Sequence, residues 1–434
     1  MTAGRFFGLG RPQGRPFYGW WVVAASSIMG MFGNGVVSSG FSRLFEPIRR
    51  DLDLSYSSMS LVFSLARTEG GFSGPLVGWL TDRFGARPMV LFGGLIAGVG
   101  MILLSRADTY WELVLLFVGV VSAGKTAGMG QTLLALVNQW FVRGRALAMS
   151  TLMTAFAGGG ALVVPLIHLG AENLGWRDTL LYAGIFITLL TIPVALVVRS
   201  RPEDLGLRPD GQEPARARTG GPAGSQSTTT QAEFTVRQAL RTRAFWFLLL
   251  GVVARVAAAN AITIHLFPML EWKGLDVGSA TFYATLMFSL SIPLRFVLGV
   301  AGGRFSPRLL LFGGMNLGAV GVLAFMLLDG PLAVVLFMAG LAVAEGISSV
   351  NWILVADYFG RARFASLMGL MSVFFNVGLF ASPIYAGWIR DNTESYNLVL
   401  VPFAALFIAS SVMFALARRP GLPVSAAPRQ ILSQ

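Results

Sequence analysis

Cysteine is absent from this chain of 434 residues, and histidine occurs only twice. Without cysteine there can be no disulfide, no thiolate metal ligand and no cysteine nucleophile. Two histidines offer no metal-ligand spacing, and no glycine-rich motif for a nucleotide phosphate occurs. Charged residues are scarce as well, at 12% against 54% hydrophobic residues, whereas a soluble globular chain carries about 25% charged residues. We therefore expect a membrane protein that is not an enzyme and that needs neither a metal nor a cofactor.

Long hydrophobic runs are what the chain has in abundance. A helix needs about 20 apolar residues to cross the hydrocarbon core of a bilayer. Such runs fall near residues 18–41, 56–80, 88–105, 111–138, 146–170 and 179–198, and after a polar stretch near 244–270, 279–302, 309–328, 331–356, 364–389 and 397–417. The sequence therefore predicts an all-α integral membrane protein with twelve transmembrane helices.

The polar stretch between the two sets of runs divides the chain into parts. It is rich in Gly, Pro, Ser, Thr and Arg, a composition typical of a flexible linker. We predict a cytoplasmic tail at 1–17, a first six-helix bundle at 18–198, a cytoplasmic linker at 199–243, a second six-helix bundle at 244–417 and a cytoplasmic tail at 418–434.

The basic residues are distributed unevenly between the two ends of the predicted spans. Of the 33 lysines and arginines, 22 fall in the termini and in the loops after the even-numbered spans, seven fall on the opposite side and four lie within spans. Because cytoplasmic loops carry the excess of basic residues, both termini are predicted to be cytoplasmic, in a plasma or inner membrane. The net charge of +12 then reflects the basic residues of the cytoplasmic loops, which lie beside membrane lipid. No nucleic acid partner is expected.

Two sequence patterns recur at nearly one spacing. The segment 78–87 matches the segment 299–308, and the same four residues, LFGG, follow each of them, at an offset of 220 to 221. The segment 140–145 matches 358–363 at an offset of 218. Transporter folds are often built from repeated bundles. The matches therefore predict two pseudo-symmetric halves of six helices each.

The first of these segments carries Gly78, Asp82, Arg83, Gly85 and Arg87 after the second span. This pattern resembles the cytoplasmic signature of the major facilitator superfamily. The resemblance implies the major facilitator fold and a cytoplasmic gate held by these residues. Glycine at the first position lets two helices approach closely, and the charged residues could form a latch at the helix ends.

Further patches narrow the resemblance. Residues 18–21, 140–145 and 201–206, together with Arg295 in the eighth span, are similar to the monocarboxylate porter and oxalate/formate antiporter branch. The resemblance implies a secondary transporter that moves a small organic anion, foremost a monocarboxylate, by alternating access with proton symport. It also implies that Arg295 binds the substrate. Animal members of the branch carry a lysine late in the first span, where Ser38 stands here.

Ionisable side chains inside the predicted spans are candidates for function, because each costs about 3 kcal/mol or more to insert into a bilayer. Six occur besides one histidine, and positive charges outnumber negative ones; they are Arg67, Glu69, Lys125, Arg255, Arg295 and Glu345. A surplus of positive charge favours an anionic substrate, since a guanidinium can hold a carboxylate by two parallel hydrogen bonds. The four basic residues are therefore candidate anion ligands.

Amide side chains in the predicted spans are candidates for orienting the substrate by hydrogen bonds; they are Asn34, Gln131, Asn260, Asn351 and Asn376. The same residue types also serve as ordinary contacts between helices.

Lys125 and Glu345 lie 220 residues apart, which matches the repeat offset. They therefore occupy equivalent points of the fourth and tenth spans, and we predict a gating ion pair between them; a static structural pair is the alternative. Glu345 and Glu69 are candidates for carrying a coupling proton, with permanent ion pairing as the alternative.

Other functions remain open on the sequence alone. An inorganic anion carrier similar to nitrate porters could use Arg67 and Arg295, and an oxalate/formate-like exchanger would use the same positive charge without symport. A membrane sensor that binds the anion without moving it is a further alternative. For each of these a single chain is expected to be the functional unit.

Overall fold

The computed structural model describes residues 17–210, 234–393 and 395–421, and these residues form helices and short connections without a β-strand. The first half contains six membrane-crossing units, several of them broken into shorter helices. Its elements are α1 (Gly19–Gly33), η2 (Asn34–Gly40), η3 (Phe41–Leu44), α2 (Phe45–Asp51), α3 (Tyr56–Phe84), α4 (Ala86–Leu104), α5 (Tyr110–Leu113), η4 (Val114–Ser122), α6 (Ala123–Met129), α7 (Gln131–Trp140), α8 (Arg145–Asn173) and α9 (Gly175–Val197).

The second half repeats this arrangement after the short helices η5 (Pro202–Leu205) and α10 (Val236–Leu240). Its elements are α11 (Arg243–Ile264), α12 (Leu266–Trp272), α13 (Val277–Ala301), α14 (Pro307–Leu327), α15 (Pro331–Gly346), α16 (Ser348–Phe359), α17 (Phe364–Thr393) and α18 (Asn397–Leu416). The prediction of twelve spans in two six-helix halves is confirmed.

Eleven helical units among the described residues are long and apolar enough to cross a membrane. The remaining unit, α3, has 29 residues and so spans about 43 Å at 1.5 Å per residue. Its composition is more polar because Arg67, Thr68 and Glu69 interrupt it. Charged residues in a membrane helix face the bundle interior or a water-filled cavity, so the polarity of α3 indicates that it lines the interior of the protein.

The fourth and tenth spans were predicted as continuous helices, but each is broken, and the two breaks lie at equivalent places. Gly130 separates α6 from α7 with φ −113° and ψ −110°, and Ile347 separates α15 from α16. In addition, the first and fourth spans contain π-helical segments, η2 and η4. Segments of π-helix are frequent at functional sites because they displace side chains from the regular α-helical positions.

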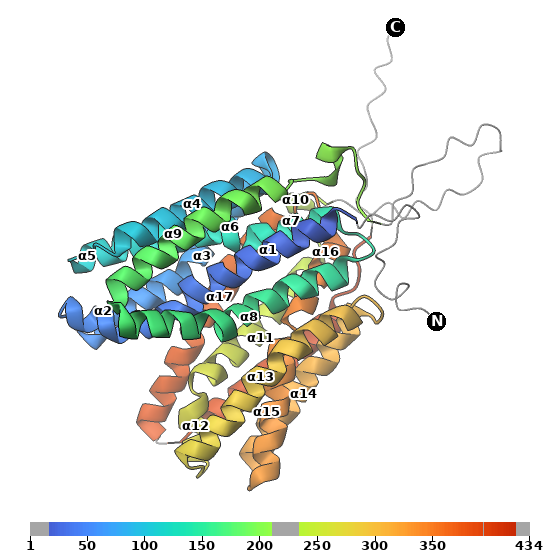
Figure 1. Ribbon diagram of the computed structural model, residues 1–434. Coiled ribbons are helices and arrows are strands. Elements are labelled where there is room, and N and C mark those ends of the chain that lie inside the picture. The colour runs from blue at the N-terminus through green and yellow to red at the C-terminus, as the bar shows by residue number, and fades with distance from the viewer. Residues whose placement is uncertain (1–16, 211–233, 394, 422–434) are drawn as a thin grey trace, which may run out of the picture.

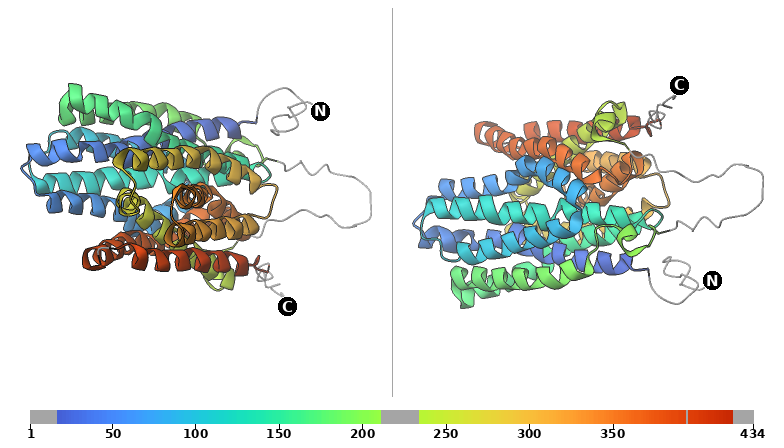
Figure 2. Two further views of the ribbon diagram at one scale, coloured as in Figure 1. Left: turned by 90° about the horizontal axis from the view of Figure 1, so that it is seen from below. Right: turned by 90° about the horizontal axis from the view of Figure 1, so that it is seen from above.

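The halves meet at one end of the molecule and diverge at the other (Figure 1). We call the end where α1 begins and α18 finishes the terminal side, and the opposite end the far side. Both views in Figure 2 place the start of α1 and the finish of α18 on the same side of the bundle. The residues that line the candidate site come from both halves.

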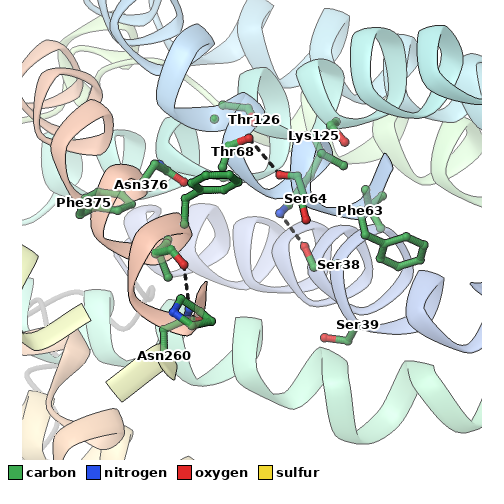
Figure 3. A pocket seen from close by; sticks show the side chains of 18 of the residues that line it. Ser38, Ser39, Phe63, Ser64, Thr68, Lys125, Thr126, Asn260, Phe375 and Asn376 are labelled. Carbon is green, nitrogen blue, oxygen red and sulfur yellow. Dashed lines mark hydrogen bonds between the residues drawn. The ribbon is translucent and has the colours of Figure 1, made fainter. Parts of the chain in front are cut away.

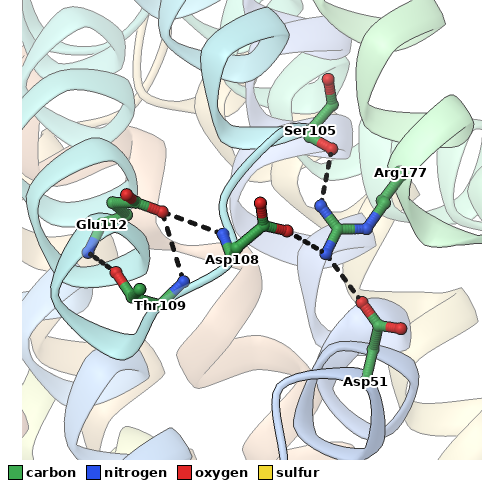
Figure 4. Close-up of polar contacts among 6 residues, drawn as sticks. All are labelled: Asp51, Ser105, Asp108, Thr109, Glu112 and Arg177. Carbon is green, nitrogen blue, oxygen red and sulfur yellow. Dashed lines mark hydrogen bonds and ion pairs between the residues drawn. The ribbon is translucent and has the colours of Figure 1, made fainter.

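One arginine ties together the far side of the first half (Figure 4). Arg177 at the start of α9 donates to the carboxylates of Asp51 and Asp108, each at 2.9 Å, and to the carbonyl of Ser105 at 3.3 Å. Asp51 is the last residue of α2, and Ser105 and Asp108 follow α4, so the ends of α2 and α4 are joined to the start of α9 at one point. These contacts of Arg177 hold the far-side connections of the first half together.

Candidate functional site

A cavity of about 710 Å³ lies between the halves. The first half lines it with η2, α3, η4, α6 and the start of α7, and the second half lines it with α11 and α17. Its polar lining residues come mainly from the first half, as Figure 3 shows for Ser38, Ser39, Ser64, Thr68 and Thr126. The first half thus presents mostly polar side chains to the cavity, and the second half faces them with mostly apolar ones.

Lys125 is the one charged side chain among the described residues that line this cavity. It lies on α6, just after the π-helical segment η4, and its Nζ donates to Ser38 Oγ on η2 at 2.6 Å (Figure 3). Both partners are therefore positioned by irregular stretches of helix. The arrangement places an ammonium group where an anion in the cavity can reach it.

Three of the predicted amide residues also line the cavity. Gln131 opens α7 after the Gly130 break, and its Oε1 is buried without a hydrogen-bond partner in the described structure. Asn376 donates to the Ser372 carbonyl of its own helix at 2.8 Å. Leaving a buried acceptor unpaired costs about 1–3 kcal/mol, so a hydrogen bond to this oxygen is favourable once the Gln131 amide turns toward the cavity.

Asn260 is fixed by a proline in the facing helix. Pro383 inside α17 has no N–H, so the carbonyl four residues earlier, that of Leu379, lacks its helical donor. Asn260 Nδ2 on α11 donates to this carbonyl at 3.1 Å, and His265 Nε2 lies 3.2 Å from the carbonyl of Pro383 itself. The proline thus fastens α11 to α17 along the wall of the cavity.

The structure places Arg255 and Arg295 away from the cavity lining, in a cluster within the second half. Arg295 Nη2 lies 3.5 Å from the Glu345 carboxylate and 3.3 Å from its carbonyl, while Arg255 Nη1 donates to the carbonyl of Ala344 at 3.3 Å. These carbonyls belong to the last turn of α15, where the helix leaves acceptors unsatisfied and its dipole favours cations. Because the tenth span is broken after α15, the carbonyl groups of its last turn are free to accept hydrogen bonds from both arginines.

Asn351 belongs to the same cluster and is fully buried, at 1% exposure. With its amide oriented to satisfy both partners, its oxygen accepts from Nε and Nη2 of Arg255, each at 3.1 Å. Asn351 is thus not among the residues that line the cavity in the conformation described. The physical reason is that a nearly buried guanidinium must have its donors satisfied within the protein, and Asn351 does this.

The predicted ion pair between Lys125 and Glu345 is not present in this conformation. Each residue has a partner in its own half, because Lys125 contacts Ser38 and Glu345 contacts Arg295. Only Lys125 belongs to the cavity lining. Pseudo-symmetry gave the two residues equivalent positions, but the halves present different faces to the cavity.

The remaining predicted residues of the spans have local partners or lie outside what the structure describes. Asn34 is half-buried and donates to the carbonyl of Phe156 on α8 at 2.8 Å, which joins two helices of the first half. Glu69 accepts from Thr126 Oγ1 at 2.8 Å, next to the cavity. The side chain of Arg67 lies outside the described part of the chain.

The signature segment closes the terminal side by joining α3 to the start of α17. Asp82 accepts from the backbone N–H of Ser366 at 2.9 Å and from its hydroxyl, in the first turn of α17, where the helix dipole favours an anion. Gly78 lies against the backbone of Ala365, which leaves no room for a side chain. Gly85 has φ +89°, so it supplies the turn into α4 that other residues adopt only with strain.

The two arginines of the signature do not pair with Asp82 in the described structure, in contrast to the predicted charged latch. Arg83 lies over the ring of Trp79 at 5.1 Å. Arg87 Nε donates to the carbonyl of Ala195 on α9 at 3.0 Å, within the first half. The contact across the halves therefore consists of the Asp82 carboxylate and the N-terminus of α17. Arg83 and Arg87 make their contacts within the first half.

Two further contacts cross the halves on the terminal side. Arg145 of α8 donates to the Asp357 carboxylate of α16 at 3.0 Å. Gln139 and Arg361 exchange hydrogen bonds through side chain and backbone at 2.8 and 2.9 Å, and Arg361 also pairs with Glu203 at 2.8 Å. Contacts between the halves thus gather on the terminal side, and the cavity opens between them on the far side.

One feature of the cavity was missed by sequence reasoning. The apolar residues of α17 that line it recur every three or four positions, at 375, 379, 380, 383 and 384, with Asn376 among them. Such spacing puts side chains on one face of a helix. The periodicity was visible in the sequence, but a largely apolar transmembrane helix gives little signal of which face meets water.

Comparisons with known proteins agree with this architecture. The sequence profile described as Major Facilitator Superfamily matches residues 24–383. Monocarboxylate transporter 2 of Mesocricetus auratus is 24% identical over 411 residues, covering 92% of this chain and 84% of the relative. Monocarboxylate transporter 11 of Homo sapiens is 26% identical over 432 residues, covering 93% and 84%. The crystal structure of a transporter, FucP, in the outward conformation has a TM-score of 0.70 at 14% identity and covers 92% of this chain and 99% of that chain.

Proposed function

Because the chain belongs to the major facilitator superfamily and is therefore a multi-pass membrane transporter, we propose that it carries a small organic anion, a monocarboxylate, by alternating access coupled to protons. The observation that carries this proposal is Lys125, a single positive charge among the described residues of a cavity between the two halves. An ammonium in a partly dehydrated site attracts a carboxylate and makes charge-assisted hydrogen bonds with it. The named relatives are monocarboxylate transporters, which supports the same substrate class.

We propose that the terminal side faces the cytoplasm, in a plasma or inner membrane. The support is the distribution of basic residues, because 22 of the 33 lysines and arginines fall in segments assigned to that side. With this orientation the contacts of Asp82 and Arg361 close the cytoplasmic side, and the cavity opens outward. One chain contains the whole cavity, so a monomer is the proposed functional unit, surrounded by lipid.

Arg295 and Glu345 are the proposed site of proton coupling. Their contact at 3.5 Å is longer than a close charge-assisted hydrogen bond, and Glu345 retains 27% of its side-chain exposure. Protonation of Glu345 would remove the negative charge that faces Arg295. The guanidinium would then be available to a substrate carboxylate when the halves rearrange, which couples one proton to one anion.

Uptake into proteoliposomes tests this proposal. With purified protein and an inward proton gradient of two pH units, which corresponds to about 2.7 kcal/mol per proton, labelled monocarboxylate is expected to enter faster than without the gradient. Nitrate and oxalate in excess should compete poorly. Uptake that is independent of the proton gradient but accelerated by internal anion would replace symport with exchange. Binding without any counterflow would identify a sensor.

A further inference from the structure

The cavity has two chemically different walls. The first half contributes Lys125 and the hydroxyls of Ser38, Ser39, Ser64 and Thr126. Two of its apolar members add little accessible surface, since Val37 is 5% and Phe117 2% exposed, while Phe63 is partly exposed. The wall that the first half presents is therefore mainly polar, and it carries the positive charge of Lys125.

The opposite wall, formed by α11 and α17, is mainly apolar and accessible, with Asn260 and Asn376 as its two amide side chains. Phe380 is 52% exposed, Ile384 57% and Ile264 46%, and all three line the cavity. Large apolar surfaces in a water-filled space are unfavourable at about 25 cal/mol per Å². Packing within the protein does not cover these side chains in the described conformation. We call Leu379, Phe380 and Ile384 of α17 the apolar stripe.

On the basis of the proposed function, we propose that the substrate is a carboxylate with an aromatic or branched aliphatic body and a hydroxyl beside the carboxylate. The carboxylate binds Lys125, and the body packs on the apolar stripe. When the Gln131 amide turns toward the cavity, the hydroxyl donates to its Oε1, which is buried without a partner in the described conformation. A short acid such as lactate fills only a small part of a cavity of about 710 Å³ and leaves the apolar stripe exposed to water.

The apolar stripe and Gln131 predict which carboxylates the cavity binds more tightly. An additional hydrophobic group buried in such a pocket changes binding by a factor of about 10 to 200. A hydroxyl that pairs with a buried acceptor adds to the discrimination, because the analogue without it leaves that acceptor unsatisfied. The ligand 3-phenyllactate combines the carboxylate, the hydroxyl and the aromatic body. L-lactate lacks the body, and 3-phenylpropanoate lacks the hydroxyl.

Binding of these three acids to the purified full-length chain, measured by calorimetry, tests the inference. We expect 3-phenyllactate to bind at least about tenfold more tightly than L-lactate, with 3-phenylpropanoate between them. Phe380→Ala and Ile384→Ala, tested separately, should each reduce the preference for 3-phenyllactate over L-lactate. Both positions are exposed, so neither substitution empties a packed core.

Phe374→Ala is the matched control. This phenylalanine lies on the same helix, outside the cavity lining, and its ring packs against Trp246 with 6.4 Å between centroids. It should leave the preference unchanged. If L-lactate and 3-phenyllactate bind equally and both need Lys125, the inference is wrong while the proposed function stands. If the preference exists but survives both α17 substitutions, the placement of the body is wrong. If no carboxylate binds, both proposals fail.

Discussion

Replacement of Lys125 by alanine is expected to lower carboxylate uptake at least about thirtyfold, which corresponds to about 2 kcal/mol lost from one charge pair. Lys125 is the described charge on the cavity wall, so its removal leaves the anion without a counterion at the point of binding. The loss should appear in KM before it appears in the maximal rate, because the interaction is already present when the substrate is bound. Initial rates over a range of substrate concentrations in proteoliposomes measure both.

The chain offers a matched control for this prediction, since Lys273 is its only other lysine. Lys273 pairs with Asp329 at 2.9 Å, beyond the cavity lining. Lys273→Ala should leave uptake essentially unchanged. Lys125→Arg should retain part of the activity because the charge remains, although the planar guanidinium does not reproduce the ammonium contact with Ser38. Normal uptake by Lys125→Ala would exclude this residue as the anion site.

Replacement of Glu345 by glutamine is expected to abolish the response of uptake to an external acid pulse, while exchange of labelled for unlabelled substrate at equal pH continues. Glutamine has nearly the same shape and can accept from Arg295, but it cannot carry a proton. A wild-type carrier should follow a gradient worth about 1.4 kcal/mol per pH unit. A variant that still responds to the gradient would place the coupling proton elsewhere.

Arg295→Ala provides the complementary result, because it leaves the Glu345 carboxylate without its counterion. Removing one partner of a buried ion pair costs about 3–5 kcal/mol, and the cost here should be smaller, about 2 kcal/mol, since both side chains retain some exposure. Adding Glu345→Gln to Arg295→Ala should restore thermal stability but not uptake. Arg418→Ala, at an exposed position on the terminal side, should change neither.

The fold was predictable because the sequence patterns that indicate it can be recognised without knowing how the side chains pack. Hydrophobic length, basic loops and the 220-residue repeat each depend on composition and spacing alone. The signature segment likewise predicted that Gly78 and Asp82 lie at the gate, because glycine marks a close approach of helices. The structure confirms the fold and adds that Asp82 bonds to a helix N-terminus and not to an arginine.

The site was harder to predict, because it depends on where helices break and which face of each helix is covered. The charge argument identified Arg255 and Arg295 as costly residues, but it could not show that the last turn of α15 offers the carbonyls of Ala344 and Glu345. That turn exists because α15 ends at Gly346. The contact between Lys125 and Ser38 requires the packing of two π-helical segments, which no periodicity in the sequence indicates.

The central claim, that an anion bound in this cavity drives reciprocal opening of the two sides, can be measured directly with spin labels, since the cysteine-free chain reacts only at introduced positions. One pair, Phe84→Cys with Phe305→Cys, spans the halves on the terminal side, and Trp111→Cys with Leu332→Cys spans them on the far side; all four positions are exposed.

Without ligand, the terminal-side pair should report one short distance and the far-side pair a long one. With 3-phenyllactate at acidic pH, the first distance should lengthen while the second shortens, and Lys125→Ala should suppress both changes. Distances that do not respond to any carboxylate, or that respond equally in Lys125→Ala, would contradict the account.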